Sequence, residues 1–130
     1  MVPHRPLMLA LVAGCLGISS TAIAADQQDL IQLLKSRQCQ ACLLSDVDLT
    51  HVDLRDADLQ QARLQRANLS HAQLDGADLS GSDLSFTSFQ GASLRGADLR
   101  NSRLTGTDLR RADLTGALLD QNALDQCHWN

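Results

Sequence analysis

Cysteine and histidine are the residues best suited to chemistry in this 130-residue chain. Cys39 and Cys42 form a Cys-x-x-Cys pair, a spacing found in local disulfides, redox-active dithiols and zinc sites. A structural zinc site uses four ligands, and no second cysteine pair lies nearby in the sequence. In an exported protein the pair predicts a structural disulfide, with a redox-active dithiol or two buried thiols as alternatives. Cys127 is then left over, either as a buried thiol or as a link between two chains.

The other polar residues do not form a catalytic pattern. His51 and His71 would share a metal only with a third ligand, which the sequence does not place close by. All fifteen acidic residues are Asp, and they are spread evenly rather than paired for acid–base catalysis. A Ser-His-Asp arrangement and a glycine-rich phosphate loop are also missing from the sequence. We therefore expect a non-enzymatic protein with no catalytic residues, no cofactor and no metal.

Residues 1–25 have the features of a signal peptide. Arg5 provides a short positive region, and residues 7–18 are largely apolar but too few to span a membrane comfortably. Small residues at 22–24 match the positions that a signal peptidase recognises, so we expect cleavage after residue 24 or 25. The mature chain would carry ten basic and fifteen acidic side chains, a balance that argues against non-specific binding to nucleic acid.

A lipoprotein signal is the competing interpretation. Residues 12–15 resemble a lipobox, in which Cys15 would be lipidated and become the first residue. Ordinary cleavage is favoured, because the leader would have only fourteen residues and the apolar run continues past Cys15. Both interpretations predict export, to the periplasm or an equivalent lumen, without a membrane span.

A repeat with a period of five dominates the rest of the chain. The residue two positions before each large apolar residue is usually small, and the residue directly before it is often Asp. A helical face needs spacings of three and four and a strand needs two, so neither element explains this period. The large apolar residues occupy seventeen consecutive positions of the repeat: Leu44, Leu49, Leu54, Leu59, Leu64, Leu69, Leu74, Leu79, Leu84, Phe89, Leu94, Leu99, Leu104, Leu109, Leu114, Leu119 and Leu124.

A chain that turns a corner after every fifth residue explains the pattern. Four such pentads close one square coil, in which every Leu points toward a common axis. The coils then stack through backbone hydrogen bonds at about 4.8 Å. One coil cannot bury its interior alone, but a stack of coils can. Seventeen pentads predict about four coils.

This pattern resembles the pentapeptide repeat family, which is summarised as Ala-Asp/Asn-Leu-x-x in tandem. Matching stretches include Ala57-Asp58-Leu59 and Ala77-Asp78-Leu79, and the resemblance covers roughly residues 42–126. It implies an all-β fold, a right-handed quadrilateral β-helix, which we place at residues 39–130. The departures are mild, at Arg63, Arg103, Leu118 and Asn122.

Both ends of such a stack need protection, because each exposes core residues and strand edges. Residues 26–38 predict a short capping helix, with Asp26 at its start, basic residues near its end and an apolar side. At the other end Trp129 falls on the Leu position, and we expect it to plug the last coil. This thinly covered end is also the candidate surface for a homodimer.

The period of four pentads predicts which outward side chains share a column. Phe86 is an apolar residue pointing outward, with Arg66 and Gly106 as its neighbours. Arg66 would either cover the ring or leave it to anchor a partner. Asp58, Asp78 and Asp98 would form an acidic column that accepts backbone hydrogen bonds or binds a basic partner. Two columns of alternating charge are also expected, Arg63–Asp83–Arg103 and Arg55–Asp75–Arg95.

We therefore expect a structural or protein-interaction module of the bacterial cell envelope, with another protein as its partner and no binding to nucleic acid. One alternative is a DNA-mimicking inhibitor of an enzyme such as gyrase, as the resemblance implies for some family members. The other alternative is a redox or metal-handling role at Cys39 and Cys42.

Overall fold

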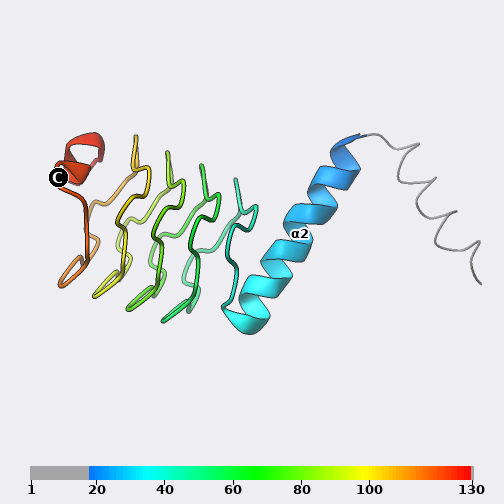
Figure 1. Cartoon of the computed structure of the whole chain (residues 1–130), viewed down its shortest axis with the longest axis horizontal. Helices are drawn as coiled ribbons and strands as arrows, with labels where there is room; N and C mark the ends of the chain where they lie inside the picture. The colour runs from blue at the N-terminus through cyan, green and yellow to red at the C-terminus, as the bar shows by residue number, and fades with distance from the viewer. Residues whose placement is uncertain (1–17, 130) are drawn as a thin grey trace, which may run out of the picture.

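A stack of coils makes up most of the molecule. The computed structural model describes residues 18–129, with side chains from Gln27 onward. The expectations about residues 1–17, including lipidation of Cys15, lie outside these residues. The described elements are helix α2, Ile18–Ser36, and the 3-10 helix η1, Ala123–Gln126. Figure 1 shows the coils lying side by side between these two elements.

The coils pair with a strict twenty-residue register. Among residues 18–129, all fourteen β-bridges are parallel and isolated, and each joins residues twenty apart, from Gln38↔Asp58 to Asp108↔His128. The Leu74 amide donates to the Ser93 carbonyl at 2.7 Å on the following coil. This register means that one coil consumes four pentads, as the sequence period predicts.

A tight turn ends each five-residue side. In one example the Ala57 amide donates to the Leu54 carbonyl at 3.1 Å. The residue before Ala57, Asp56, has φ 58°, so the turn has the positive φ that type II turns require at their third residue. Glycine takes this position six times in the described chain, because it adopts positive φ without steric cost.

The interior is filled by the repeated leucines and Phe89. The fourteen large residues from Leu44 to Leu109 are at most 3% exposed, as predicted. The last three, at 114, 119 and 124, are only partly buried, because within the described residues no full coil packs on their far side. Polar residues at small positions are satisfied: Thr87 Oγ1 donates to the Leu64 carbonyl at 2.6 Å.

Helix α2 differs from the predicted capping helix at its start. It begins at Ile18 rather than at Asp26, because residues 22–25 are mostly alanine and do not interrupt a helix. It ends at Ser36, where Arg37 takes φ 57° and its amide still donates to the Leu33 carbonyl at 2.8 Å.

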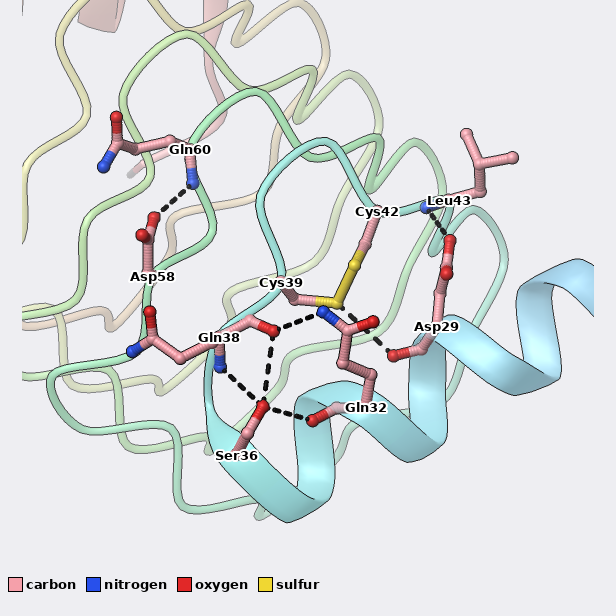
Figure 2. The surroundings of a disulfide bond; sticks show 9 residues. All are labelled: Asp29, Gln32, Ser36, Gln38, Cys39, Cys42, Leu43, Asp58 and Gln60. Atoms are coloured by element: carbon pink, nitrogen blue, oxygen red, sulfur yellow. Dashed lines mark hydrogen bonds between the residues drawn. A yellow bond between two sulfur atoms is a disulfide. The ribbon is translucent and has the colours of Figure 1, made fainter.

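Helix α2 contacts the core through part of its apolar side. Leu33 is fully buried in the core cluster and Leu30 packs against it. Ile31 and Leu34 remain 45% and 53% exposed, so only half of the predicted apolar side is used. Asp29 Oδ2 also accepts a hydrogen bond from the Leu43 amide at 2.7 Å, which fastens the helix to the first coil (Figure 2).

The C-terminal end keeps the register but is not sealed. Helix η1 replaces one side, and pairing resumes at His128, opposite Asp108. Trp129 therefore stands one coil beyond Leu109, where the period places it. Its side chain is 52% exposed and does not pack into the core cluster, so the expected aromatic plug is wrong.

Candidate interaction surfaces

The Cys39–Cys42 pair lies between helix α2 and the first coil. The two Sγ atoms lie in contact, and the Cα atoms are 5.3 Å apart. Both residues are buried, at 0% and 5% exposure, and Cys39 Sγ also lies 3.3 Å from the Asp29 carbonyl oxygen (Figure 2). This position suits a link between helix and coil rather than an accessible redox centre, because a redox dithiol must be reached by its substrate.

Cys127 is held at the opposite end. Its Sγ lies 3.4 Å from the Ala123 carbonyl oxygen and 3.6 Å from that of Leu104. Partial burial raises the pKa of this thiol, which disfavours the reactive thiolate. An open hollow of about 470 Å³ lies here, lined by Arg110, Cys127, His128 and Trp129. The Arg110 guanidinium is already bound to Asp108, so it is not free to bind a ligand in this hollow.

His51 and His71 stack as the twenty-residue period predicts. Their ring centroids are 5.1 Å apart and the planes differ by 12°. The His71 ring also lies over Gly91, where an added Cβ would be 2.6 Å from Nδ1. Within the described part of the chain, no group of three or more His, Cys, Asp or Glu residues gathers as metal ligands.

The Asp58, Asp78 and Asp98 column accepts backbone hydrogen bonds, as the turn interpretation predicts. Each Oδ1 atom accepts from the amide two residues later, at 3.0 to 3.2 Å. Asp98 also binds the Arg100 guanidinium with both oxygens, and this hydrogen bonding lowers its pKa. The column lies on the side that precedes the Phe86 pentad, so the structure places these two candidate surfaces on different sides of the coil.

Arginines pair within a pentad more often than along the expected columns. Arg55 forms a bidentate contact with Asp53, at 2.8 and 2.9 Å, instead of pairing with Asp75. The Arg95 guanidinium contacts Asp113 at 3.2 Å, so the ion pairs predicted along the Arg55–Asp75–Arg95 column are wrong. Within that column the Arg95 amide donates to Asp75 Oδ1 at 3.1 Å. The reason is geometric: residues on either side of an inward Leu both point outward on one side of the coil, within reach of an Arg side chain.

Arg66 does not cover Phe86. Its guanidinium donates to both carboxylate oxygens of Asp46, at 2.8 and 2.9 Å, on the preceding coil. Of the two alternatives, the cation–π contact is therefore not formed. Asp46 at this column position could have been recognised in the sequence as the competing partner, because it is also twenty residues from Arg66.

Phe86 is the most exposed large apolar side chain among the described residues, at 63%. It sits at the positive-φ turn position with φ 58°, where bulky residues are rare. Its ring lies against Gly106 of the next coil: an added Cβ there would be only 2.5 Å from Cδ1. A glycine is thus needed beneath the ring.

The side that leads to Phe86 presents arginines and a recessed acid. Backbone bridges place Arg63, Asp83 and Arg103 in one column, as predicted. Among the described residues, Asp83 contacts Arg103 but forms no ion pair with Arg63. The Asp83 side chain is 23% exposed, and it accepts hydrogen bonds from Ser85 and Gln65. The Arg103 side chain is 71% exposed and lies 3.7 Å from Asp83, a long contact. The outermost charges on this side are therefore positive.

Stacked coils with an interior filled by the repeated leucines define a β-solenoid. The chain belongs to the pentapeptide repeat family, whose model matches eight copies over residues 42–81 and 77–121. Proteins of this family fold as right-handed quadrilateral β-helices and are generally non-enzymatic structural or interaction proteins.

Solved structures of pentapeptide repeat proteins resemble the chain. The protein alr5209 from Nostoc PCC 7120 is 31% identical over 78% of this chain and 93% of its own, with a TM-score of 0.43. Rfr23 from the cyanobacterium Cyanothece 51142 is 26% identical over 80% and 99%, with a TM-score of 0.37. HetL from Nostoc sp. strain PCC 7120, which is involved in regulating heterocyst differentiation, is 40% identical over 62% of this chain and 38% of its own, with a TM-score of 0.35.

No match was found among curated protein sequences. Among residues 18–129, neither helix combines the length and the apolar character needed to cross a bilayer.

Proposed function

We propose that this protein is a non-enzymatic protein-interaction module of the bacterial cell envelope. The twenty-residue backbone register is the observation that supports this proposal most strongly. It holds outward side chains in fixed columns on a rigid wall, while the repeated leucines fill the interior and leave the core without room for a substrate. Such a wall suits recognition of another protein, because its side chains are ordered before binding.

Proximity labelling in the envelope tests this role. A labelling enzyme fused to the C-terminus should mark one reproducible neighbour, and the mark should persist when the labelling time is shortened. An exported fusion of the same enzyme to an unrelated domain provides the background. A labelling pattern that cannot be distinguished from this background would contradict the proposed function.

We also propose an exported chain of about four coils, capped by the part of α2 that follows the cleavage site and locked by an oxidised Cys39–Cys42 pair. The placement of both cysteines in the buried junction between α2 and the first coil, with Cα atoms 5.3 Å apart, and the sequence of residues 1–25 support this. Intact mass of the protein recovered from the envelope is the test. A chain starting at residue 25 or 26 and two protons lighter before reduction is expected. A lipid-bearing mass starting at Cys15 would contradict cleavage after residue 24 or 25. Free thiols at Cys39 and Cys42 would contradict the disulfide.

Association of two copies through the C-terminal end is a further part of the proposal. Leu118 and Trp129 are 47% and 52% exposed at this end, next to partly buried core leucines. Light scattering after gel filtration should show a dimer that Leu118→Asp dissociates. A monomer at all concentrations up to about 100 μM would exclude it as a functional contact.

A further inference from the structure

We infer that Phe86, Arg63 and Arg103 form a docking site for an acidic protein segment that carries an apolar side chain. This inference rests on the proposed interaction role and names the surface and the class of partner. We call these three residues the Phe86 surface.

The backbone at Phe86 is the first argument. Its φ of 58° is typical of this turn position, which glycine fills six times and polar residues such as Arg66 and His71 fill in other pentads of the described chain. Phe86 is the one large apolar residue that takes this position among the described residues. A side chain held in such a conformation, and left 63% exposed, does not contribute to the core. An exposed Phe86 at this position is explained if its ring binds a partner.

The position of the ring is the second argument. Gly106 provides the flat floor against which the ring packs, and any Cβ there would overlap with it. Arg66 is withdrawn from the ring because Asp46 binds both ends of its guanidinium. The ring is therefore held on one side and open on the other, and a partner side chain can pack on it with little ordering cost.

The charges around the ring indicate the class of partner. Bridges at 63–83 and 83–103 place Arg63 and Arg103 on the coils before and after the Phe86 pentad. The intervening Asp83 is recessed and its hydrogen-bonding capacity is largely used by Ser85 and Gln65. Partial burial acts to raise the pKa of Asp83, but these hydrogen bonds and the Arg103 charge together lower it. Strand spacing puts the two arginines about 10 Å apart along the stack. Carboxylates on either side of an apolar residue complement this layout, whereas a basic segment would be repelled.

Titration of the ¹⁵N-labelled exported protein with two defined peptides tests the inference. The acidic probe is acetyl-Asp-Asp-Trp-Asp-Asp-amide, and the matched basic probe replaces every Asp with Lys. The acidic probe should shift the amide signals of residues 85–87 and 103–106, with an affinity that weakens as salt is raised. The basic probe should leave those signals in place.

Variants complete the test. Phe86→Gly relieves the unfavourable φ, so the fold should persist while binding of the acidic probe weakens about tenfold or more. Arg63→Gln with Arg103→Gln should weaken it by about fivefold. The matched control, Arg95→Gln with Arg111→Gln, makes the same charge change on other sides of the coil and should leave binding unchanged.

The possible outcomes separate this inference from the proposed function. Four results would each overturn the Phe86 surface. They are equal shifts with both probes, shifts confined to the Asp58 column, no shifts at about 5 mM acidic probe, and undiminished binding of the acidic probe by Phe86→Gly. A reproducible envelope neighbour found alongside any of these results would preserve the interaction role and reject only this surface. Loss of that neighbour in Phe86→Gly would support both.

Discussion

Replacing Gly106 with Ala tests whether the Phe86 ring is packed against the next coil. Gly106 has φ +67°, a region in which any L side chain is strained. A Cβ there would lie 2.5 Å from Cδ1 and 2.6 Å from Cε1 of the Phe86 ring, so the ring has to move. The substitution therefore adds a side-chain displacement to a backbone cost.

Gly96 provides the control that separates the two effects. Its φ is +66°, but no atom lies within 4 Å of an added Cβ. Gly96→Ala should therefore lower the free energy of unfolding by the backbone cost alone, about 1–2 kcal/mol. Turning an exposed ring out of its preferred rotamer costs about 0.5–1.5 kcal/mol. We expect Gly106→Ala to be about 1 kcal/mol less stable than Gly96→Ala.

Urea denaturation followed by circular dichroism measures both variants, alone and combined with Phe86→Gly. Without the ring, Gly106→Ala and Gly96→Ala should cost the same. Equal costs in the presence of Phe86, within about 0.3 kcal/mol, would refute the packing of the ring on Gly106. A difference that survives in Phe86→Gly would also refute it, because its cause would then lie elsewhere.

Three further predictions concern the core, the junction and the charges. Leu74→Ala removes a fully buried side chain and should cost about 2–5 kcal/mol, whereas Leu119→Ala, at a partly buried position, should cost clearly less in the same urea assay. If Cys39 and Cys42 form the disulfide proposed above, which closes a loop of four residues, its reduction should cost about 2 kcal/mol and speed hydrogen exchange chiefly in α2; uniform acceleration along the whole chain would contradict a local role. The pKa of Asp98 is lowered by hydrogen bonds from its neighbouring arginine, so its stabilising effect is present above about pH 4 and is lost as pH falls through the lowered folded value. Asp98→Asn should therefore narrow the difference between urea midpoints at about pH 7 and about pH 2, and an unchanged difference would show that this carboxylate does not contribute.

The interior and register were predictable because each depends on residue type and spacing alone. A Leu at every fifth position has one arrangement in which it is buried, and that arrangement fixes which residues stack. The start of α2 was not predictable in the same way. Asp is favoured at the start of a helix, but it does not stop a helix that begins before it. The alanines before Asp26 are strong helix formers, so the helix continues through this residue.

Surface partners were predictable only in part. The sequence places Arg66 near both Asp46 and Phe86, and the structure shows that the carboxylate binds the guanidinium. Arg55 could reach Asp53 in its own pentad or Asp75 on the next coil, and in the structure it binds Asp53. Which acid an arginine binds depends on side-chain rotamers and on differences of a few ångströms. The twenty-residue period predicts only which residues share a column, so it does not predict these pairs.

The twenty-residue register has a consequence for how such a chain can change. Insertion or deletion of one pentad keeps every leucine inside, because the interior repeats every five residues, yet it moves each later residue by a quarter turn. A deletion between Arg63 and Phe86 would leave the ring intact but on another side of the solenoid from that arginine. Only a change of four pentads returns every later side chain to its own column, so the surface of this protein has a coarser unit of variation than its core.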